Sequence, residues 1–178
     1  MNIFHSIEQA ARQRGLGFVV IGGIAVIEHG YPRFTADLDL LVQREARGGW
    51  HALLSDLGYD MTQERETFGQ YASRDGTGWP LDLMFVNEPT FQGIWAASRP
   101  AEVQGAHLPL VSLEHLLSLK LHALKHSHLR RFLKDFDDVL HLVAVNKIDL
   151  RSPASRGLFL KYGNADLYDK FCRACEAQ

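Results

Sequence analysis

The chain has 178 residues, of which 46% are hydrophobic and 22% are charged, and its formal net charge is -2. This length is enough for one domain with a substantial core, or for one domain with a helical appendage. The charge balance excludes a globally basic nucleic-acid-binding protein but leaves room for a local basic patch.

The sequence shows no signal for secretion or membrane insertion. The N-terminal segment MNIFHSIEQAARQRG lacks the apolar centre of a signal peptide, and no apolar run approaches the roughly 18 residues of a membrane span. We therefore expect a cytoplasmic protein without a membrane partner. Cys172 and Cys175 form a C-x-x-C motif, which we interpret as two reduced thiols on a terminal helix because no second ligand pair accompanies them.

The first 111 residues mix strand and helix patterns. In chain order, we expect a helix over 4–14, a strand over 18–21, a helix over 24–29, a strand over 36–42, a helix over 45–57, and strands over 59–62, 68–74, 79–86 and 103–110. Gly15 suits the end of the first helix. The stretch 75–78, Asp-Gly-Thr-Gly, predicts a hairpin between two of the strands.

From Ser112 onward the pattern is helical throughout. We expect helices over 112–125 and 129–145, and two shorter ones after Ser152 and Asn164. The fold class is therefore α+β, with a mixed β-sheet core flanked by helices over residues 1–111, followed by a C-terminal helical half over residues 112–178.

Two carboxylates in a buried strand require an explanation. In a strand over 36–42, Asp37 and Asp39 project from one face while Leu38 and Leu40 face the other side. At roughly 4 Å and an effective dielectric near 20, two like charges repel by about 4 kcal/mol. A divalent cation between them reverses the sign of this interaction, and Mg²⁺ prefers oxygen ligands.

A glycine pair precedes this strand in the sequence. Gly22-Gly23 stands between a strand and a helix, where bare backbone N–H groups form a ready site for an anion. A phosphate site beside a metal site indicates a nucleotide.

The glycine pair, Asp37-Leu38-Asp39 and the isolated strand carboxylate Asp82 resemble the active-site pattern of the DNA polymerase β-like nucleotidyltransferase superfamily. The closer similarity is to a bacterial branch written Gly-Gly-x-Ala, then Arg-x-Thr-x-Asp-hydrophobic-Asp. This chain reads GGIA at 22–25 and RFTADLD at 33–39. The branch includes the abortive-infection type IV (AbiEii-like) toxins and the small antibiotic nucleotidyltransferases.

The resemblance implies roles for particular residues. Residues 1–111 would be the catalytic core, and residues 112–178 a helical region that supports the substrate and nucleotide. Asp37, Asp39 and Asp82 would be catalytic and would bind two Mg²⁺ ions. The nucleotide-binding residues would be Gly22, Gly23, Arg33, Thr35, Lys120 and Asp135.

Some of these residues have a structural alternative. Arg33 and Thr35 either contact phosphate or order the loop ahead of the carboxylates. Lys120 either donates to the triphosphate or extends along a partly exposed helix face. Asp135 reaches the nucleotide, pairs with Lys120, or lies on a solvated face.

The implied function is Mg²⁺-dependent transfer of an NMP from an NTP to a hydroxyl, with release of pyrophosphate. The acceptor is either an RNA, such as a tRNA end, or a small molecule, and the AbiEii-like relatives suggest a toxin–antitoxin role. The alternative is a catalytically weak protein of the same fold that acts as a binding partner, as one component of a toxin–antitoxin pair with a cognate protein.

Three further motifs are interpreted as structural. Residues 146–149, NKID, copy the guanine-reading motif of GTPases, but the sequence has no G-x-x-x-x-G-K-[ST] loop. A histidine cluster lacks further zinc ligands, and a basic stretch either binds an RNA backbone or is a solvated helix face. The cluster is His122, His126 and His128, and the stretch is Lys125, His126, His128, Arg130, Arg131 and Lys134.

Overall fold

The computed structural model describes residues 2–125 and 129–176. Within it the chain divides into two compact units. The first, here called the sheet unit, comprises residues 1–25 and 33–112, and the second, the helical unit, comprises residues 26–32 and 113–178.

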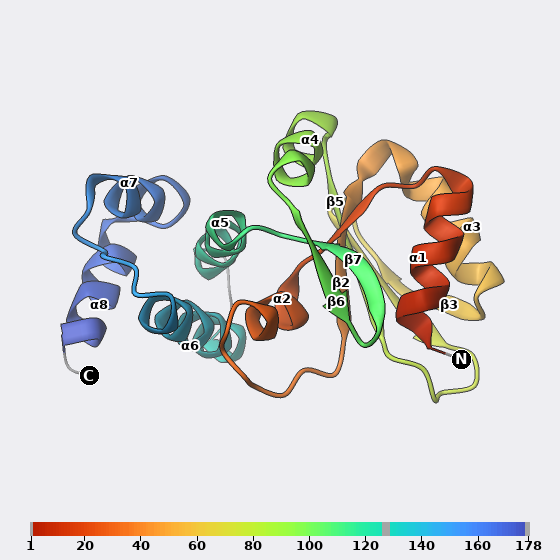
Figure 1. The fold of residues 1–178 in the computed structure, drawn as a ribbon, viewed down its shortest axis with the longest axis horizontal. Coiled ribbons are helices and arrows are strands. Elements are labelled where there is room, and N and C mark those ends of the chain that lie inside the picture. Colours follow the sequence, from red (N-terminus) through yellow and green to blue (C-terminus); the bar gives the residue numbers. More distant parts are fainter. Residues whose placement is uncertain (1, 126–128, 177–178) are drawn as a thin grey trace. The chain divides into compact units, whose positions relative to one another are not determined.

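The sheet unit is built on a mixed sheet (Figure 1). Its elements are α1 (Ile3–Arg14), β1 (Phe18–Val20), the start of α2 (Gly22–Glu28), β2 (Leu38–Gln43), η1 (Arg44–Ala46), α3 (Arg47–Asp56), β3 (Tyr59–Glu64), β4 (Phe68–Ser73), β5 (Leu81–Val86), α4 (Glu88–Ala96), β6 (Arg99–Val103) and β7 (Ala106–Leu110). The strand order is β3-β4-β5-β2-β1-β7-β6. Strand β2 is parallel to β5 and antiparallel to β1.

The alternation of side chains along β5 separates a core face from a half-open face. Leu81, Leu83 and Phe85 are buried, whereas Asp82 and Met84 between them are only half-buried. Helices α1 and α3 lie on one face of the sheet, and α4 lies on the other (Figure 1). The sheet therefore has one face that leaves room for polar side chains at Asp82.

The helical unit contains α5 (Leu113–Leu124), α6 (Leu129–Val145), α7 (Pro153–Tyr162) and α8 (Ala165–Glu176). Phe136 of α6 stacks on Phe171 of α8 with ring centroids 4.2 Å apart. The segment 26–32 also belongs to this unit, and its Tyr31 hydroxyl donates to Asp137 Oδ2 at 2.7 Å. The Tyr31 ring stacks on His141 at 4.0 Å, so this segment is attached to α6.

The predicted fold class, a mixed sheet core with helices, is confirmed. The prediction of a single strand over 103–110 was wrong, because residues 99–110 form the antiparallel hairpin β6–β7. Gln104 and Gly105 have φ of 51° and 84°, so the chain turns where a continuous strand was expected. Helix α4 was not predicted, although Asn87 caps it by accepting from the Thr90 backbone N–H at 3.0 Å.

These observations do not test some of the predictions. The functional division into residues 1–111 and 112–178 stays a prediction. His126 and His128 lie outside the described residues. In the described part of the chain, no helix combines the length and the apolar character needed to cross a membrane.

Candidate active site

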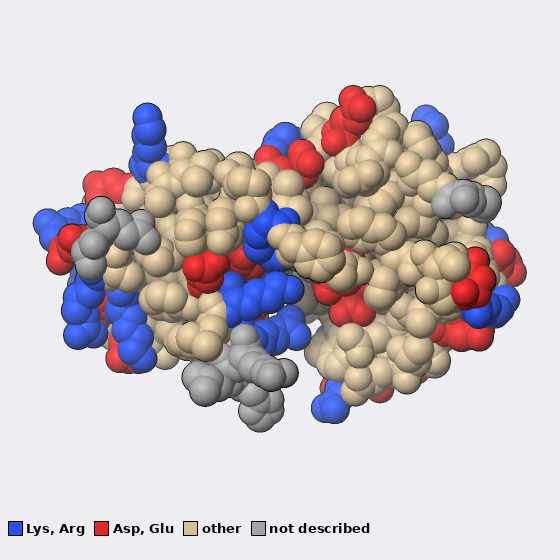
Figure 2. Space-filling view, turned by 90° about the horizontal axis from the view of Figure 1, so that it is seen from below, with Lys and Arg blue, Asp and Glu red and all other residues tan. Residues whose placement is uncertain are grey.

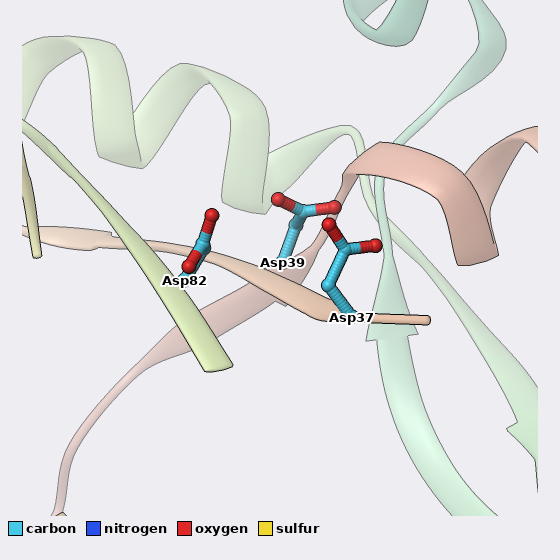
Figure 3. Close-up of side chains that lie close together, drawn as sticks. All are labelled: Asp37, Asp39 and Asp82. Atoms are coloured by element: carbon cyan, nitrogen blue, oxygen red, sulfur yellow. The ribbon is translucent and has the colours of Figure 1, made fainter. Parts of the chain in front are cut away.

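Three aspartates meet on the half-open face of the sheet. Asp39 and Asp82 are register partners on the parallel strands β2 and β5, and Asp37 lies immediately before β2. Each offers a carboxylate oxygen, and these oxygens all lie within 4.8 Å of one another. Figure 3 shows the three side chains rising from the same side of the two strands. The predicted convergence of these residues is therefore present.

The glycine pair abuts these carboxylates. Gly22 has φ of +63°, and a Cβ added to it would lie 1.8 Å from Asp39 Oδ2. A Cβ on Gly23 would lie 2.2 Å from Thr35 Oγ1. Both positions exclude any side chain, and at Gly22 the backbone conformation itself favours glycine. The Gly23 backbone N–H donates to Asp39 Oδ2 at 3.4 Å.

Thr35 and Arg33 make contacts that order the loop ahead of β2. Thr35 is buried, and its hydroxyl donates to Asp37 Oδ1 at 2.8 Å. Arg33 Nη1 donates to the Phe34 carbonyl at 2.8 Å. These contacts correspond to the loop-ordering alternative, and a contact with phosphate stays a prediction for both residues.

Sequence reasoning missed one neighbour of the carboxylates. Gln70 of β4 donates from Nε2 to Asp82 Oδ1 at 3.3 Å and to Oδ2 at 3.1 Å. Gln70 is twelve positions before Asp82 in the chain, and only the antiparallel pairing of β4 with β5 brings the two together. The predicted hairpin could have indicated this pair, but the register was needed to find it.

Lys120 and Asp135 come together in the helical unit. Lys120 Nζ lies 2.7 Å from Asp135 Oδ1 and 2.7 Å from Asp138 Oδ2, and all three side chains are at least nine-tenths buried. Asp138 was not singled out from the sequence, although it lies one helical turn after Asp135. Of the alternatives given for Asp135, the structure shows its pairing with Lys120. Asp138 is a second carboxylate on the same ammonium.

The remaining motifs make no comparable cluster among the described residues. Lys147, Asp149, Cys172 and Cys175 line a cavity of about 320 Å³ in the helical unit. Both cysteines are free thiols, and burial, followed by the charges of Cys172 and Glu176, raises the pKa of the Cys175 thiol. A raised pKa disfavours the reactive thiolate, which is consistent with the structural interpretation.

The donor set at the three aspartates suits a hard divalent cation. All three ligands are carboxylate oxygens, which Mg²⁺ and Mn²⁺ prefer. The side chains are half-buried, so water and ions can reach the carboxylates. The residues present therefore fit the metal that the sequence pattern implies.

Comparison with solved structures shows which known proteins have a similar fold. The structure is similar to ANT(2")-Ia in complex with adenylyl-2"-tobramycin, with a TM-score of 0.67, 18% identity, and coverage of 90% of this chain and 94% of that one. It is also similar to an antigenic nucleotidyltransferase-like protein from Paracoccidioides brasiliensis (TM-score 0.61, 16% identity, coverage 99% and 91%). The lincomycin-bound lincosamide adenylyltransferase LnuA matches with a TM-score of 0.54, 17% identity, and coverage of 78% and 93%.

A family match confirms the predicted enzyme class, a nucleotidyltransferase. The model of an uncharacterised nucleotidyltransferase family matches residues 1–156, so the chain belongs to that family. The sequence has no significant match among curated proteins. The AbiEii-like branch is not confirmed by these comparisons.

We expect Gly22→Ala to disrupt the site through the new methyl group. A Cβ at this position would displace the Asp39 carboxylate, and a residue other than glycine in the left-handed region costs about 1–2 kcal/mol. The free energy of unfolding in urea and the affinity for Mn²⁺ in a titration should both fall. Gly48→Ala is the matched control, because Gly48 lies within α3 with nothing near its Cβ position, and helix propensity should stabilise it by about 1 kcal/mol. Wild-type Mn²⁺ affinity in Gly22→Ala would contradict this account.

We expect Asp138→Ala to lower the free energy of unfolding by about 1–3 kcal/mol, because it removes one of the two buried carboxylates at 2.7 Å from the Lys120 ammonium, although Asp135 still balances its charge. Urea unfolding followed by circular dichroism measures the loss. Asp169→Ala serves as the control, since Asp169 is exposed on α8 and should leave the free energy essentially unchanged. If Asp138→Ala and Asp169→Ala change the free energy of unfolding equally, the contact between Asp138 and Lys120 does not stabilise the fold.

Proposed function

We propose that the protein transfers an NMP from an NTP to the hydroxyl of a polyhydroxylated small molecule, in a Mg²⁺-dependent reaction. The observation that supports this most directly is the cluster of three carboxylates beside a glycine pair that tolerates no side chain. The family match supports nucleotidyl transfer as the reaction class.

Each part of the site has a proposed role. Asp37, Asp39 and Asp82 would hold the Mg²⁺ ions, which when bound would neutralise phosphate charge and stabilise the attacking and leaving oxygens. Gly22 and Gly23 allow the Asp39 carboxylate and the Thr35 hydroxyl to approach the backbone, and the backbone N–H groups of this turn are proposed to bind the triphosphate. In the reaction, the acceptor oxygen bonds to the α-phosphorus, the bond to the bridging oxygen breaks, and pyrophosphate leaves. Asp82 is proposed to accept the hydroxyl proton.

Lys120 and Asp135 are proposed to bind the nucleotide, as the sequence resemblance implies. A lysine ammonium has three N–H donors, and the two carboxylates at 2.7 Å engage two of them. The third donor is the one that a phosphate oxygen would take. Arg33 and Thr35 are proposed to act on the nucleotide through the loop that they order.

The small-molecule acceptor is favoured over RNA by two observations. The structures with TM-scores of 0.67 and 0.54 carry, in one case, an adenylylated tobramycin and, in the other, lincomycin. This chain also covers 94% and 93% of those proteins, so the chains are of similar extent. Both basic and acidic side chains lie on the face shown in Figure 2.

The test is transfer of label from each α-³²P-labelled NTP in the presence of Mg²⁺. Aminoglycosides, lincosamides and total tRNA are offered separately as acceptors. We expect label in a small molecule and none without Mg²⁺. Label in tRNA would instead establish the RNA acceptor. Absence of transfer together with absence of metal-dependent NTP binding would support the binding-partner alternative and a toxin–antitoxin role.

We expect Asp37→Asn combined with Asp39→Asn to abolish transfer while leaving the fold intact. Because the substitution removes repulsion between carboxylates, metal-free unfolding in urea should require more denaturant than in the wild type. Asp166→Asn, an exposed change on α8, is the control and should retain both transfer and stability. Transfer that persists in the double variant would end the assignment of these residues.

A further inference from the structure

Gln70 stands directly across from Asp82 in the sheet. The two residues are register partners on the antiparallel strands β4 and β5, so their side chains leave the same face about 5 Å apart. Gln70 Nε2 lies 3.3 Å from Oδ1 and 3.1 Å from Oδ2 of Asp82. The amide nitrogen therefore faces both oxygens of the carboxylate.

This contact is not required to satisfy a buried group. Asp82 and Gln70 are both half-buried, so water can hydrate the carboxylate if the amide is removed. What the amide adds is position, because a donor within hydrogen-bond distance of both oxygens restricts where the carboxylate can lie.

The other two carboxylates are held in a similar way. Asp37 accepts from the Thr35 hydroxyl at 2.8 Å, and Asp39 accepts from the Gly23 backbone N–H at 3.4 Å. All three donors are uncharged, and they come from three different segments of the chain. A Lys or Arg in any of these places would neutralise the charge that attracts a cation, whereas an uncharged donor orients the carboxylate and leaves its charge in place.

We propose that Gln70 is a positioning residue that holds the Asp82 carboxylate in the orientation needed to share a divalent cation with Asp37 and Asp39. This inference rests on the proposed function, since it assumes that the three carboxylates bind a metal. Residues that orient metal ligands typically account for 10–100-fold in metal affinity. Gln70 acts only through Asp82 and touches neither nucleotide nor acceptor in this proposal.

The test is Mn²⁺ binding to the full chain without nucleotide, measured by electron paramagnetic resonance. Gln70→Leu keeps the approximate size of the side chain but cannot donate, and its Mn²⁺ dissociation constant should rise about 10–100-fold. Gln63→Leu is the matched control, because Gln63 pairs with Gln70 from the neighbouring strand β3 and is exposed. It should bind Mn²⁺ as the wild type does. Asp82→Asn provides the reference for loss of the ligand itself.

The outcomes separate this inference from the proposed function. Wild-type affinity in Gln70→Leu, with weak binding in Asp82→Asn, would overturn the role of Gln70 while leaving the metal site in place. Equal binding by wild type and Asp82→Asn would instead remove the metal site on which the inference depends. If Gln70→Leu does not fold, Gln70→Ala replaces it and should raise the Mn²⁺ dissociation constant in the same way, and wild-type affinity in Gln70→Ala would overturn the role of Gln70. Where transfer is measured, the loss in Gln70→Leu should be recovered by raising the metal concentration.

Discussion

Mutual repulsion among three carboxylates is the constraint around which the sheet unit is arranged. Oxygens of Asp37, Asp39 and Asp82 lie within 4.8 Å of one another. At about 4 Å and an effective dielectric near 20, each pair costs about 4 kcal/mol, less where water screens it. Uncharged donors contact each of the three carboxylates, and the alternate residues of β5 on the opposite face of the sheet are buried.

Local patterns were sufficient to predict much of this site. The alternation around Asp37-Leu38-Asp39 placed both acids on one face, and the glycine pair beside them has the close approach that glycine permits. The β4–β5 hairpin followed from turn residues at 75–78. These features depend on neighbours within a few residues, which is why sequence alone reveals them.

Features that depend on pairing between distant segments were not predictable in the same way. Gln70 meets Asp82 only because of one antiparallel register, and Asp138 joins Lys120 only because α5 packs on α6. The β6–β7 turn was missed for another reason. Gln104 adopts a positive φ that is uncommon outside glycine, so its residue type did not indicate a turn and a single strand over 103–110 was predicted.

The position of Asp82 is set by the core on the opposite face of its own strand. Leu81, Leu83 and Phe85 are buried, and this alternation fixes which face each residue of β5 presents. A shift of one residue in the pairing with β2 would turn these three side chains toward the half-open face and Asp82 into the core. Exposure of these three side chains, at about 1.5–3 kcal/mol each, and the desolvation of the Asp82 carboxylate in the core would both oppose that shift. Burial of apolar residues on one face of the sheet thus holds the charged groups together on the other.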